Sequence, residues 1–339
     1  MGANRTETGR RRVAVACQGG GSHTAFTAGV LQRLLRSADH EIVAFTGTSG
    51  GAIDALLAWY GLLADGGDRA GQRLVDFWRA ISAGSWPEQV VNQWALATYR
   101  ALGTVVAPEV SPYLYPSFAG DRLRQVLNDH VDFAAMPALA AQHGPSMPAL
   151  LVGAVEVTSG AFKIFRNAWD AGAAGPVLAV TVDAVLASAA IPTLFRAVPV
   201  EGGLYWDGLF SQNPPVRDLP EAGPEEIWVV QINPTRRDGE PTTMAEIRDR
   251  RNELAGNLSL NQELFFIEKI NELVRAEAFA PGSKYRVIPV RRLEMSLDRK
   301  LDTESKLDRS PAFIGELLER GRVQAEEFLR EAAMEAAPA

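Results

Sequence analysis

The stretch that decides the fold is RVAVACQGGGSHTAFTAGVLQRLL, residues 12–35, followed by EIVAFTGTSGGAIDALLAWYGLL, residues 41–63. Each stretch begins with a short run of apolar and β-branched residues and then passes through glycines. Such a run, stopped by glycine, is typical of a buried strand entering a tight turn. We therefore predict strands at residues 12–18 and 41–46.

The residues after each turn have apolar side chains at helical spacing, which predicts helices at residues 22–35 and 52–63. Ser22 is the expected N-cap of the first helix. Two consecutive strand–turn–helix units indicate an α/β protein with a parallel sheet and helices on its faces.

The rest of the chain continues this pattern less regularly. Tryptophan, tyrosine and proline are scattered over residues 85–118 with weak periodicity, which favours irregular core packing there, although a lid or part of an acyl pocket is an alternative. Residues 198–210 read as strand and turn. Further strands are predicted at 150–157, 161–165, 226–232 and 284–290, and further helices at 180–190, 244–278 and 311–333.

Composition bounds the location and partners of the protein. The formal net charge of -7 argues against nucleic acid as a partner. No apolar run is long enough to span a membrane, and Cys17 stands alone, so no internal disulfide is expected. These features predict a cytoplasmic protein. We expect residues 1–11 to be a disordered basic segment and residues 12–339 a single domain, in which 217–339 form a helix-rich C-terminal extension packed on the rest.

The second glycine turn carries a candidate nucleophile. Gly47, Thr48, Ser49, Gly50 and Gly51 form GTSGG, which satisfies the G-x-S-x-G pattern of a nucleophile elbow. The pattern alone is common, but the elbow also requires a strand before it and a helix after it. Both are predicted here independently of the motif, so Ser49 is the expected nucleophile and its neighbours form the elbow.

A serine needs a base to accept its proton. The usual order of serine, acid and histidine is excluded, because no histidine follows His143. Asp207 is the best remaining candidate. Tyr205 and Trp206 precede it, and aromatic neighbours can desolvate a carboxylate and raise its pKa, although an Asp-Gly pair is most often only a surface turn.

The first glycine turn is the expected oxyanion hole. Gly19, Gly20 and Gly21 offer backbone N–H groups without side chains, next to the strand that carries Ser49. One alternative is a dinucleotide-binding turn, but Thr24 stands where its last glycine is required. The other alternative is a purely structural turn.

Taken together, these motifs resemble the patatin-like phospholipase family over about residues 12–216. The matching segments are Gly19-Gly20-Gly21 with Gly29-Val30-Leu31, the GTSGG elbow, ASAAIP at 187–192, Asp207-Gly208, and Asn213-Pro214-Pro215. The resemblance implies a three-layer α/β/α fold around a mainly parallel sheet. It also implies catalysis by a dyad of Ser49 and Asp207 with the glycine run as oxyanion hole. Such catalysis requires no metal or cofactor.

Three positions depart from the family pattern. The family usually has arginine or lysine and then glycine where this chain has His23 and Thr24, and often glycine or alanine where Leu209 stands. His23 is expected to support the oxyanion loop only if it is protonated or donates a hydrogen bond.

The combined hypothesis is a serine acyl hydrolase of the phospholipase A or lysophospholipase type. Its expected partner is a lipid or other fatty-acyl ester, reached by transient contact with a membrane surface. The alternatives are a soluble carboxylesterase, or a non-catalytic lipid-binding or regulatory module of the same fold.

Overall fold

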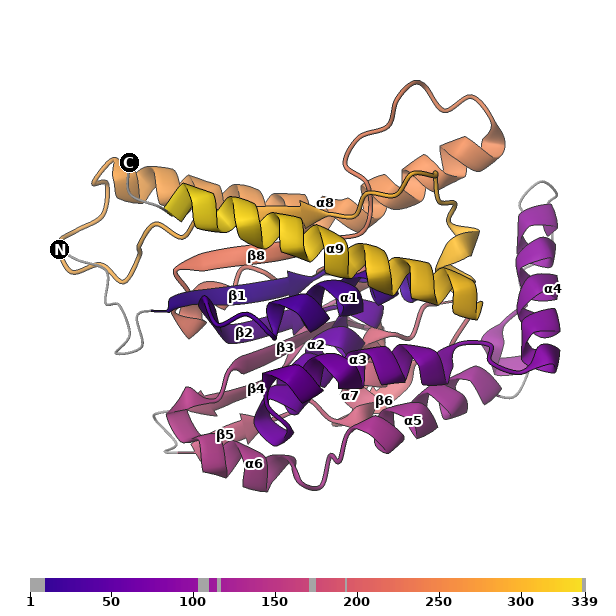
Figure 1. The fold of residues 1–339 in the computed structure, drawn as a ribbon, viewed down its shortest axis with the longest axis horizontal. Helices are drawn as coiled ribbons and strands as arrows, with labels where there is room; N and C mark the ends of the chain where they lie inside the picture. Colours follow the sequence, from indigo (N-terminus) through magenta and orange to yellow (C-terminus); the bar gives the residue numbers. More distant parts are fainter. Residues whose placement is uncertain (1–9, 103–109, 115–116, 171–174, 193, 337–339) are drawn as a thin grey trace.

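The computed structural model describes residues 10–102, 110–114, 117–170, 175–192 and 194–336. Over these residues a mainly parallel sheet lies between two layers of helices (Figure 1). The predicted three-layer α/β/α architecture is therefore confirmed. Residues 1–9 of the predicted disordered segment lie outside the described residues, and Arg11 already belongs to the first strand.

The sheet has the strand order β5-β4-β3-β2-β1-β8-β9, with β7 pairing both β3 and β6. The five strands β3, β2, β1, β8 and β9 pair in this order, and each of these pairs is parallel. The remaining pairs, β3 with β4, β3 with β7, β4 with β5 and β6 with β7, are antiparallel. The strands are β1 Arg11–Cys17, β2 His40–Gly47, β3 Ala149–Glu156, β4 Phe162–Asp170, β5 Gly175–Leu178, β6 Val198–Val200, β7 Gly203–Asp207, β8 Glu226–Gln231 and β9 Val290–Glu294.

The register of β3 brings two distant parts of the chain together. β2 pairs with β3 up to Gly47 opposite Val152, and β7 pairs with β3 from Ala154, which lies opposite Asp207. β4 pairs with one edge of β3 over residues 150–155. β7 must therefore pair with the opposite edge of β3, which is the edge that β2 occupies up to Val152. Asp207 therefore lies just beyond the end of the strand that leads to Ser49.

Helices cover both faces of the sheet. Val13, Val15 and Cys17 point into one core with α1 to α3, α5 to α7 and α9, whereas Ala14 and Ala16 point into a second core with α8. This alternation is the period-two pattern of a strand buried on both faces. The helices are α1 Ala25–Leu34, α2 Gly50–Ala64, α3 Gly67–Ile81, α4 Trp86–Leu102, α5 Phe118–His130, α6 Met136–His143, α7 Val182–Ser188, α8 Met244–Arg275 and α9 Pro311–Ala336.

The last helix is packed closely on the first one. A Cβ added to Gly29 of α1 would lie 2.0 Å from the carbonyl oxygen of Leu318, and one added to Gly321 of α9 would lie 2.0 Å from that of Phe26. Only glycine permits this approach of two backbones. In Figure 1, α9 accordingly runs across α1 along the front of the molecule.

Several predicted elements differ from the structure. The helix predicted from Ser22 begins instead as a 3-10 turn, η1 (Gly21–Thr24), whose N-cap residue is Gly20, so the Ser22 cap was wrong. The late strand was predicted at residues 284–290 but lies at Val290–Glu294, so the two share only Val290. Sequence reasoning also missed α3, α5, α6 and β5.

The prediction of irregular core packing for residues 85–118 was wrong over its described part. Residues Trp86–Leu102 form the helix α4, which stands away from the body of the molecule in Figure 1. Its tryptophans Trp86 and Trp94 are exposed rather than packed in a core.

No helix in the described ranges combines the length and apolarity needed to cross a membrane.

Candidate active site

Ser49 occupies a strained turn between β2 and α2. Its φ of 57° and ψ of −130° are unusual for a residue with a side chain. Such strain is characteristic of a nucleophile elbow, in which a sharp turn presents the serine at the end of a strand. Ser49 also immediately precedes the 15-residue helix α2, whose N-terminal partial positive charge lies beside its side chain.

The glycines around Ser49 are required by close backbone packing. A Cβ added to Gly47 would lie 2.2 Å from the carbonyl oxygen of Gly51, and one added to Gly51 would lie 2.3 Å from that of Cys17. The turn therefore closes on itself and on the end of β1. Thr48 is fixed as well, because its hydroxyl donates a hydrogen bond of 2.6 Å to the carbonyl of Gln212.

Ser188, at the end of α7, holds the elbow in place. The Ser49 amide donates to Ser188 Oγ at 3.0 Å, and Ser188 Oγ donates to the carbonyl of Gly153 on β3 at 2.6 Å. One buried hydroxyl thus connects the backbone of Ser49 to the central sheet. Sequence reasoning had used this residue only as part of the ASAAIP motif and had assigned it no role.

Replacing Ser188 with alanine is expected to lower kcat by about tenfold to a hundredfold and to destabilise the fold by about 1–3 kcal/mol, because two buried polar groups lose their partner. Steady-state kinetics and urea unfolding measure the two effects. Thr46→Val is the matched control, since the buried Thr46 hydroxyl has no hydrogen-bond partner within the described chain. Equal losses in both variants would contradict the role of Ser188.

Asp207 ends β7 with its backbone and one oxygen fully engaged. Its amide donates to the carbonyl of Ala190 at 3.0 Å, and its Oδ1 accepts from the Leu209 amide at 2.8 Å. Its Oδ2 is buried and has no hydrogen bond of ordinary geometry among the described residues. The Ser49 side chain nevertheless lies close enough to lower the pKa of this carboxyl. The candidate nucleophile and the candidate base are therefore neighbours.

Burial changes the proton affinity of Asp207. It raises the pKa of this carboxyl to about 7, although the hydrogen bond from Leu209 and the contact with Ser49 both lower it. A raised pKa was predicted from the aromatic neighbours. Of these, Tyr205 packs edge-on against Phe165 in the core, with 5.3 Å between the ring centroids. At neutral pH the carboxyl is poised between its ionised and protonated forms.

The first glycine turn packs directly against Ser49. A Cβ added to Gly19 would lie 2.9 Å from Ser49 Cβ. The Gly19 amide, however, already donates to Asn213 Oδ1 at 2.7 Å. In the part of the chain that the structure describes, the amides of Gly20 and Gly21 have no such partner. Two of the three predicted donors are thus available.

Thr24 explains one departure from the family pattern. Its hydroxyl donates to the carbonyl of Gly21 at 2.8 Å and stabilises the turn η1. A Cβ added to Gly50 would lie 2.2 Å from Thr24 Oγ1, so the oxyanion loop and the elbow are in contact. The amide of Gly50, at the start of α2, donates no hydrogen bond among the described residues.

His23 is neutral in this environment. Burial and the nearby Lys306 lower its pKa to about 3. Its Nε2 lies 2.8 Å from Ser305 Oγ, and that hydroxyl donates its proton to the carbonyl of Asp302. Nε2 must therefore carry the proton and donate to Ser305. His23 therefore contacts Ser305 as a hydrogen-bond donor and not as a cation.

Helix α8, in the C-terminal extension, supports the loops of the site. Gln18 Nε2 donates to Asn257 Oδ1 at 2.8 Å, and Gln212 Nε2 donates to Glu263 Oε1 at 2.6 Å. Asn213 Nδ2 also donates to the carbonyl of Gly256 at 3.3 Å. The extension, which had no predicted role, therefore anchors Gln18, which precedes the first glycine turn, and the segment 212–213, which contacts Gly19 and Thr48.

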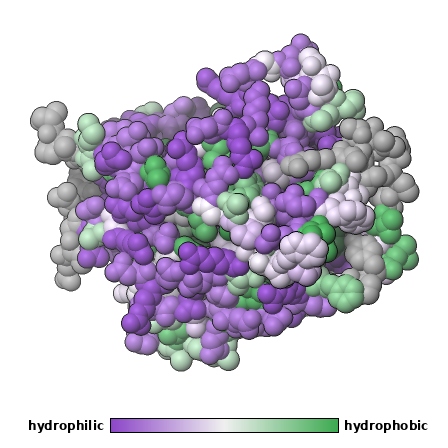
Figure 2. Space-filling view, turned by 45° about the vertical axis from the view of Figure 1, so that its right-hand side comes forward, coloured by the Kyte–Doolittle hydropathy of each residue, from purple (hydrophilic) through white to green (hydrophobic). Residues whose placement is uncertain are grey.

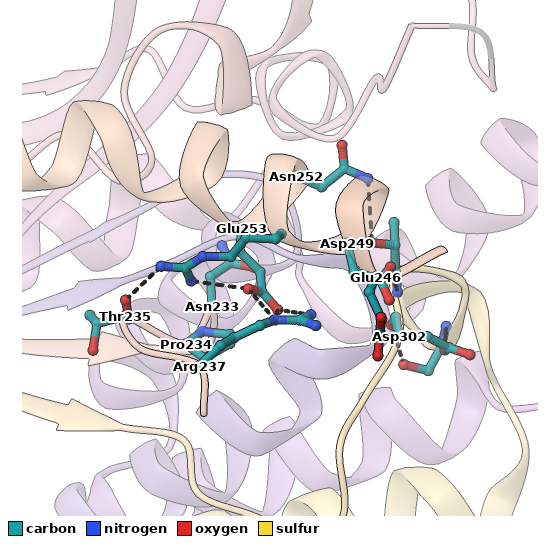
Figure 3. Close-up of polar contacts among 12 residues, drawn as sticks. Asn233, Pro234, Thr235, Arg237, Glu246, Asp249, Asn252, Glu253 and Asp302 are labelled. Carbon is teal, nitrogen blue, oxygen red and sulfur yellow. Dashed lines mark hydrogen bonds and ion pairs between the residues drawn. The ribbon is translucent and has the colours of Figure 1, made fainter. Parts of the chain in front are cut away.

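The beginning of α8 is tied to the segments around residues 233–237 and 302–303 (Figure 3). Arg237 forms an ion pair with Glu253, with a shortest N–O distance of 2.5 Å, and Asp249 accepts a hydrogen bond of 3.0 Å from the Thr303 amide. In the described parts of the chain no three His, Cys, Asp or Glu side chains are grouped so as to hold a metal ion. The ion pair and the hydrogen bond fix the beginning of α8 to the segments that hold Arg237 and Thr303.

The comparison with protein families agrees with this geometry. The model of the family described as patatin-like phospholipase matches residues 15–220, which is more than half of the chain and includes every candidate catalytic residue. The chain belongs to the patatin-like phospholipase family. Membership supports lipid acyl hydrolysis as the general class of activity. No curated protein matches the sequence.

Three solved structures are similar to this chain at low sequence identity and low TM-score. VipD from Legionella pneumophila matches with a TM-score of 0.40 and 13% identity over 97% of this chain and 69% of VipD. The type III effector ExoU matches with a TM-score of 0.35 and 14% identity over 94% of this chain and 53% of ExoU. ExoU in its heterodimeric complex with SpcU from Pseudomonas aeruginosa matches with a TM-score of 0.36 and 15% identity. That match covers 95% of this chain and 51% of ExoU.

Proposed function

We propose that the protein hydrolyses carboxylic esters of lipids with Ser49 as nucleophile and Asp207 as its base. The observation that carries this proposal is the position of the buried Asp207 carboxyl at the end of β7. Its Oδ2 has no hydrogen-bond partner among the described residues, and the Ser49 side chain lies next to it. A base without a competing hydrogen bond at one oxygen is free to accept the serine proton.

In the first half-reaction, Asp207 takes the proton from Ser49 Oγ as that oxygen bonds to the ester carbonyl carbon. The carbonyl oxygen becomes an oxyanion, which the amides of Gly20, Gly21 and Gly50 stabilise together with the N-terminus of α2. The protonated Asp207 then donates to the leaving alcohol oxygen as the ester bond breaks. An acyl group remains on Ser49.

In the second half-reaction, a water molecule loses a proton to Asp207 and attacks the acyl carbon through the same oxyanion. When this intermediate collapses, the fatty acid is released and Asp207 returns its proton to Ser49 Oγ. Proton transfers in both directions suit a group whose pKa of about 7 lies near the working pH.

The proposal is tested by labelling the wild-type protein with a fluorophosphonate and mapping the modified residue by mass spectrometry. We expect one phosphonylated site, at Ser49, and no labelling after unfolding in urea, because only an activated serine displaces the fluoride. Labelling of another serine would overturn the assignment. A folded protein without any label would favour the non-catalytic lipid-binding alternative.

The substrate class is tested separately, with the same protein and a panel of esters. Release of fatty acid from phosphatidylcholine, lysophosphatidylcholine and a soluble butyrate ester distinguishes a phospholipase A, a lysophospholipase and a general carboxylesterase. We expect hydrolysis of the lipid substrates to exceed that of the soluble ester. The reverse order would support the carboxylesterase alternative.

A further inference from the structure

One group of exposed, large apolar side chains lies on α4 and on segments near Asp207. Those of α4 include Trp86, which is 76% exposed, and Trp94, which is 70% exposed. Figure 2 shows hydrophobic surface gathered on its right-hand side, the side on which α4 stands in Figure 1. We call this group the apolar collar, and its members are Trp86, Val90, Val91, Trp94, Val110, Tyr113, Leu114, Phe118 and Phe210.

Helix α4 has two different faces. Asn92 and Leu96 are buried, and the Asn92 side chain forms hydrogen bonds with Asp308 and with the amide of Arg309. The opposite face carries Trp86 and Trp94, eight positions apart, with the two exposed valines between them. Apolar residues at this spacing follow one stripe of a helix, and here that stripe faces away from the protein.

The buried face of α4 connects the collar to the oxyanion loop. Asn92 binds Asp308, which directly follows the 3-10 turn η6 (Glu304–Leu307). That turn packs on the oxyanion loop, since a Cβ added to Gly21 would lie 2.3 Å from the carbonyl oxygen of Lys306 and His23 donates to Ser305. One side of the collar therefore rests on the oxyanion-hole side of the site.

The remaining members of the collar lie on the Asp207 side. Phe210 is 61% exposed and ends the 3-10 turn η4 (Gly208–Phe210), which begins directly after Asp207. The Tyr113 hydroxyl accepts a hydrogen bond of 3.2 Å from the Ala197 amide, just before β6. These contacts place collar residues on both sides of the dyad.

A small cavity joins the start of α5 to the same side of the site. It has a volume of about 90 Å³, and Ser117 and Gly120, which flank Phe118, contribute to its lining together with Ala190. The carbonyl of Ala190 accepts the hydrogen bond from the Asp207 amide. The exposed Phe118 side chain thus belongs to a segment that packs next to the candidate base.

We propose that the apolar collar inserts into the interface of a zwitterionic lipid layer and brings the dyad to the lipid surface. The proposal rests on the proposed lipid acyl hydrolase function and names the surface by which the protein reaches its substrate. Tryptophan and other aromatic side chains are favoured at the level of lipid headgroups, where an apolar ring and a polar edge are both accommodated.

The charges of the protein favour a zwitterionic partner over an anionic one. The only charged side chain among the exposed, described residues of α4 is Glu88, and its carboxylate accepts hydrogen bonds from Ser85. The formal net charge of -7 opposes attraction to an anionic lipid surface. Insertion of apolar side chains, which salt screens little, is therefore the expected source of binding.

The test measures binding without turnover by using the Ser49→Ala variant and sucrose-loaded phosphatidylcholine vesicles in a sedimentation assay. We expect this variant to bind, and raising NaCl from about 0.1 M to about 0.5 M to leave the bound fraction unchanged. Adding Trp86→Ser and Trp94→Ser is expected to lower the partition coefficient by about tenfold or more, because two aromatic anchors are lost.

The matched control adds Phe265→Ser and Phe266→Ser to the Ser49→Ala protein. Both phenylalanines are 65% exposed on α8, and they lie outside the collar. This control is expected to bind vesicles like its parent, and circular dichroism checks that both sets of variants are folded. Binding that requires anionic lipid, or equal losses from the two pairs of substitutions, would overturn the collar.

A second copy of the chain is the other occupant that the test detects. Dimerisation of the parent in sedimentation velocity, lost on the tryptophan substitutions and accompanied by no vesicle binding, would also overturn the proposal. The proposed hydrolase function fails by a different result, namely the absence of fluorophosphonate labelling in the wild-type protein. Vesicle binding by an unlabelled protein would support the collar and reject only the chemistry.

Discussion

Replacing Ser49 with alanine is expected to abolish both the burst and the steady-state release of p-nitrophenol from a p-nitrophenyl acyl ester. Without Oγ no acyl-enzyme can form, so kcat should fall by about 10⁴-fold to 10⁶-fold. The variant keeps the Cβ that packs against Gly19 and the amide that donates to Ser188. Its far-UV circular dichroism spectrum should therefore stay native.

Ser22→Ala is the control for this substitution. Ser22 is another buried serine next to the oxyanion loop, and its side chain donates no hydrogen bond among the described residues. Its replacement is expected to change kcat by less than about tenfold. Residual burst kinetics in the Ser49→Ala protein, or an equal loss in both variants, would contradict Ser49 as the nucleophile.

The elements predicted best from the sequence are the strand–turn–helix units that carry the two glycine turns. β1 and β2 lie within one residue of their predicted bounds, because buried strands of a parallel sheet are continuous apolar runs that glycine ends abruptly. Asp207 was predicted as the base on another ground, because no histidine follows His143 and two aromatic residues precede Asp207.

The contacts that complete the site were not predictable in the same way. The amides of Gly19 and Ser49 are bound by Asn213 and Ser188, which lie far along the chain. Only the fold decides which amide a side chain reaches, so the loss of Gly19 as an available donor has no signal in sequence. The neutral state of His23 follows likewise from its burial beneath η6.

Helix α4 shows a different limit. Its apolar stripe, which includes Trp86 and Trp94, is exposed, whereas Asn92 on the opposite face is buried. An amphipathic pattern assigns apolar residues to the core, and here the assignment is inverted. Scattered aromatic residues in such a segment therefore indicate a surface of interaction as readily as irregular packing.

Asp207→Asn is the second substitution for which a large effect is expected. Asparagine keeps the shape of the side chain and an oxygen for the Leu209 amide, but it cannot accept the serine proton. We expect kcat to fall by about 10²-fold to 10⁴-fold. In the wild-type protein, log kcat/KM should rise with pH up to the pKa of about 7 and level off above it, because only ionised Asp207 is a base. A pH-independent wild-type rate would contradict this role.

The same substitution is expected to stabilise the protein at alkaline pH. Burial raises the folded-state pKa of Asp207 to about 7, so the folded protein retains a proton that the unfolded chain loses near its ordinary value of about 3.9. The stability that this carboxyl contributes below the unfolded pKa is therefore lost as the pH rises through the folded pKa. Asparagine never ionises, so Asp207→Asn should gain on wild type with rising pH, by up to about 4 kcal/mol above pH 7.

Urea unfolding at about pH 5 and about pH 8 measures this gain. Ser49→Ala is the control, because it is inactive but keeps the buried carboxyl and so should lose stability with pH as the wild type does. A constant difference between Asp207→Asn and wild type at the two pH values would show that Asp207 is not held with a raised pKa. The expected result would show that burial of the Asp207 carboxyl destabilises the folded protein at alkaline pH. The same burial raises the pKa of the proposed base beside Ser49.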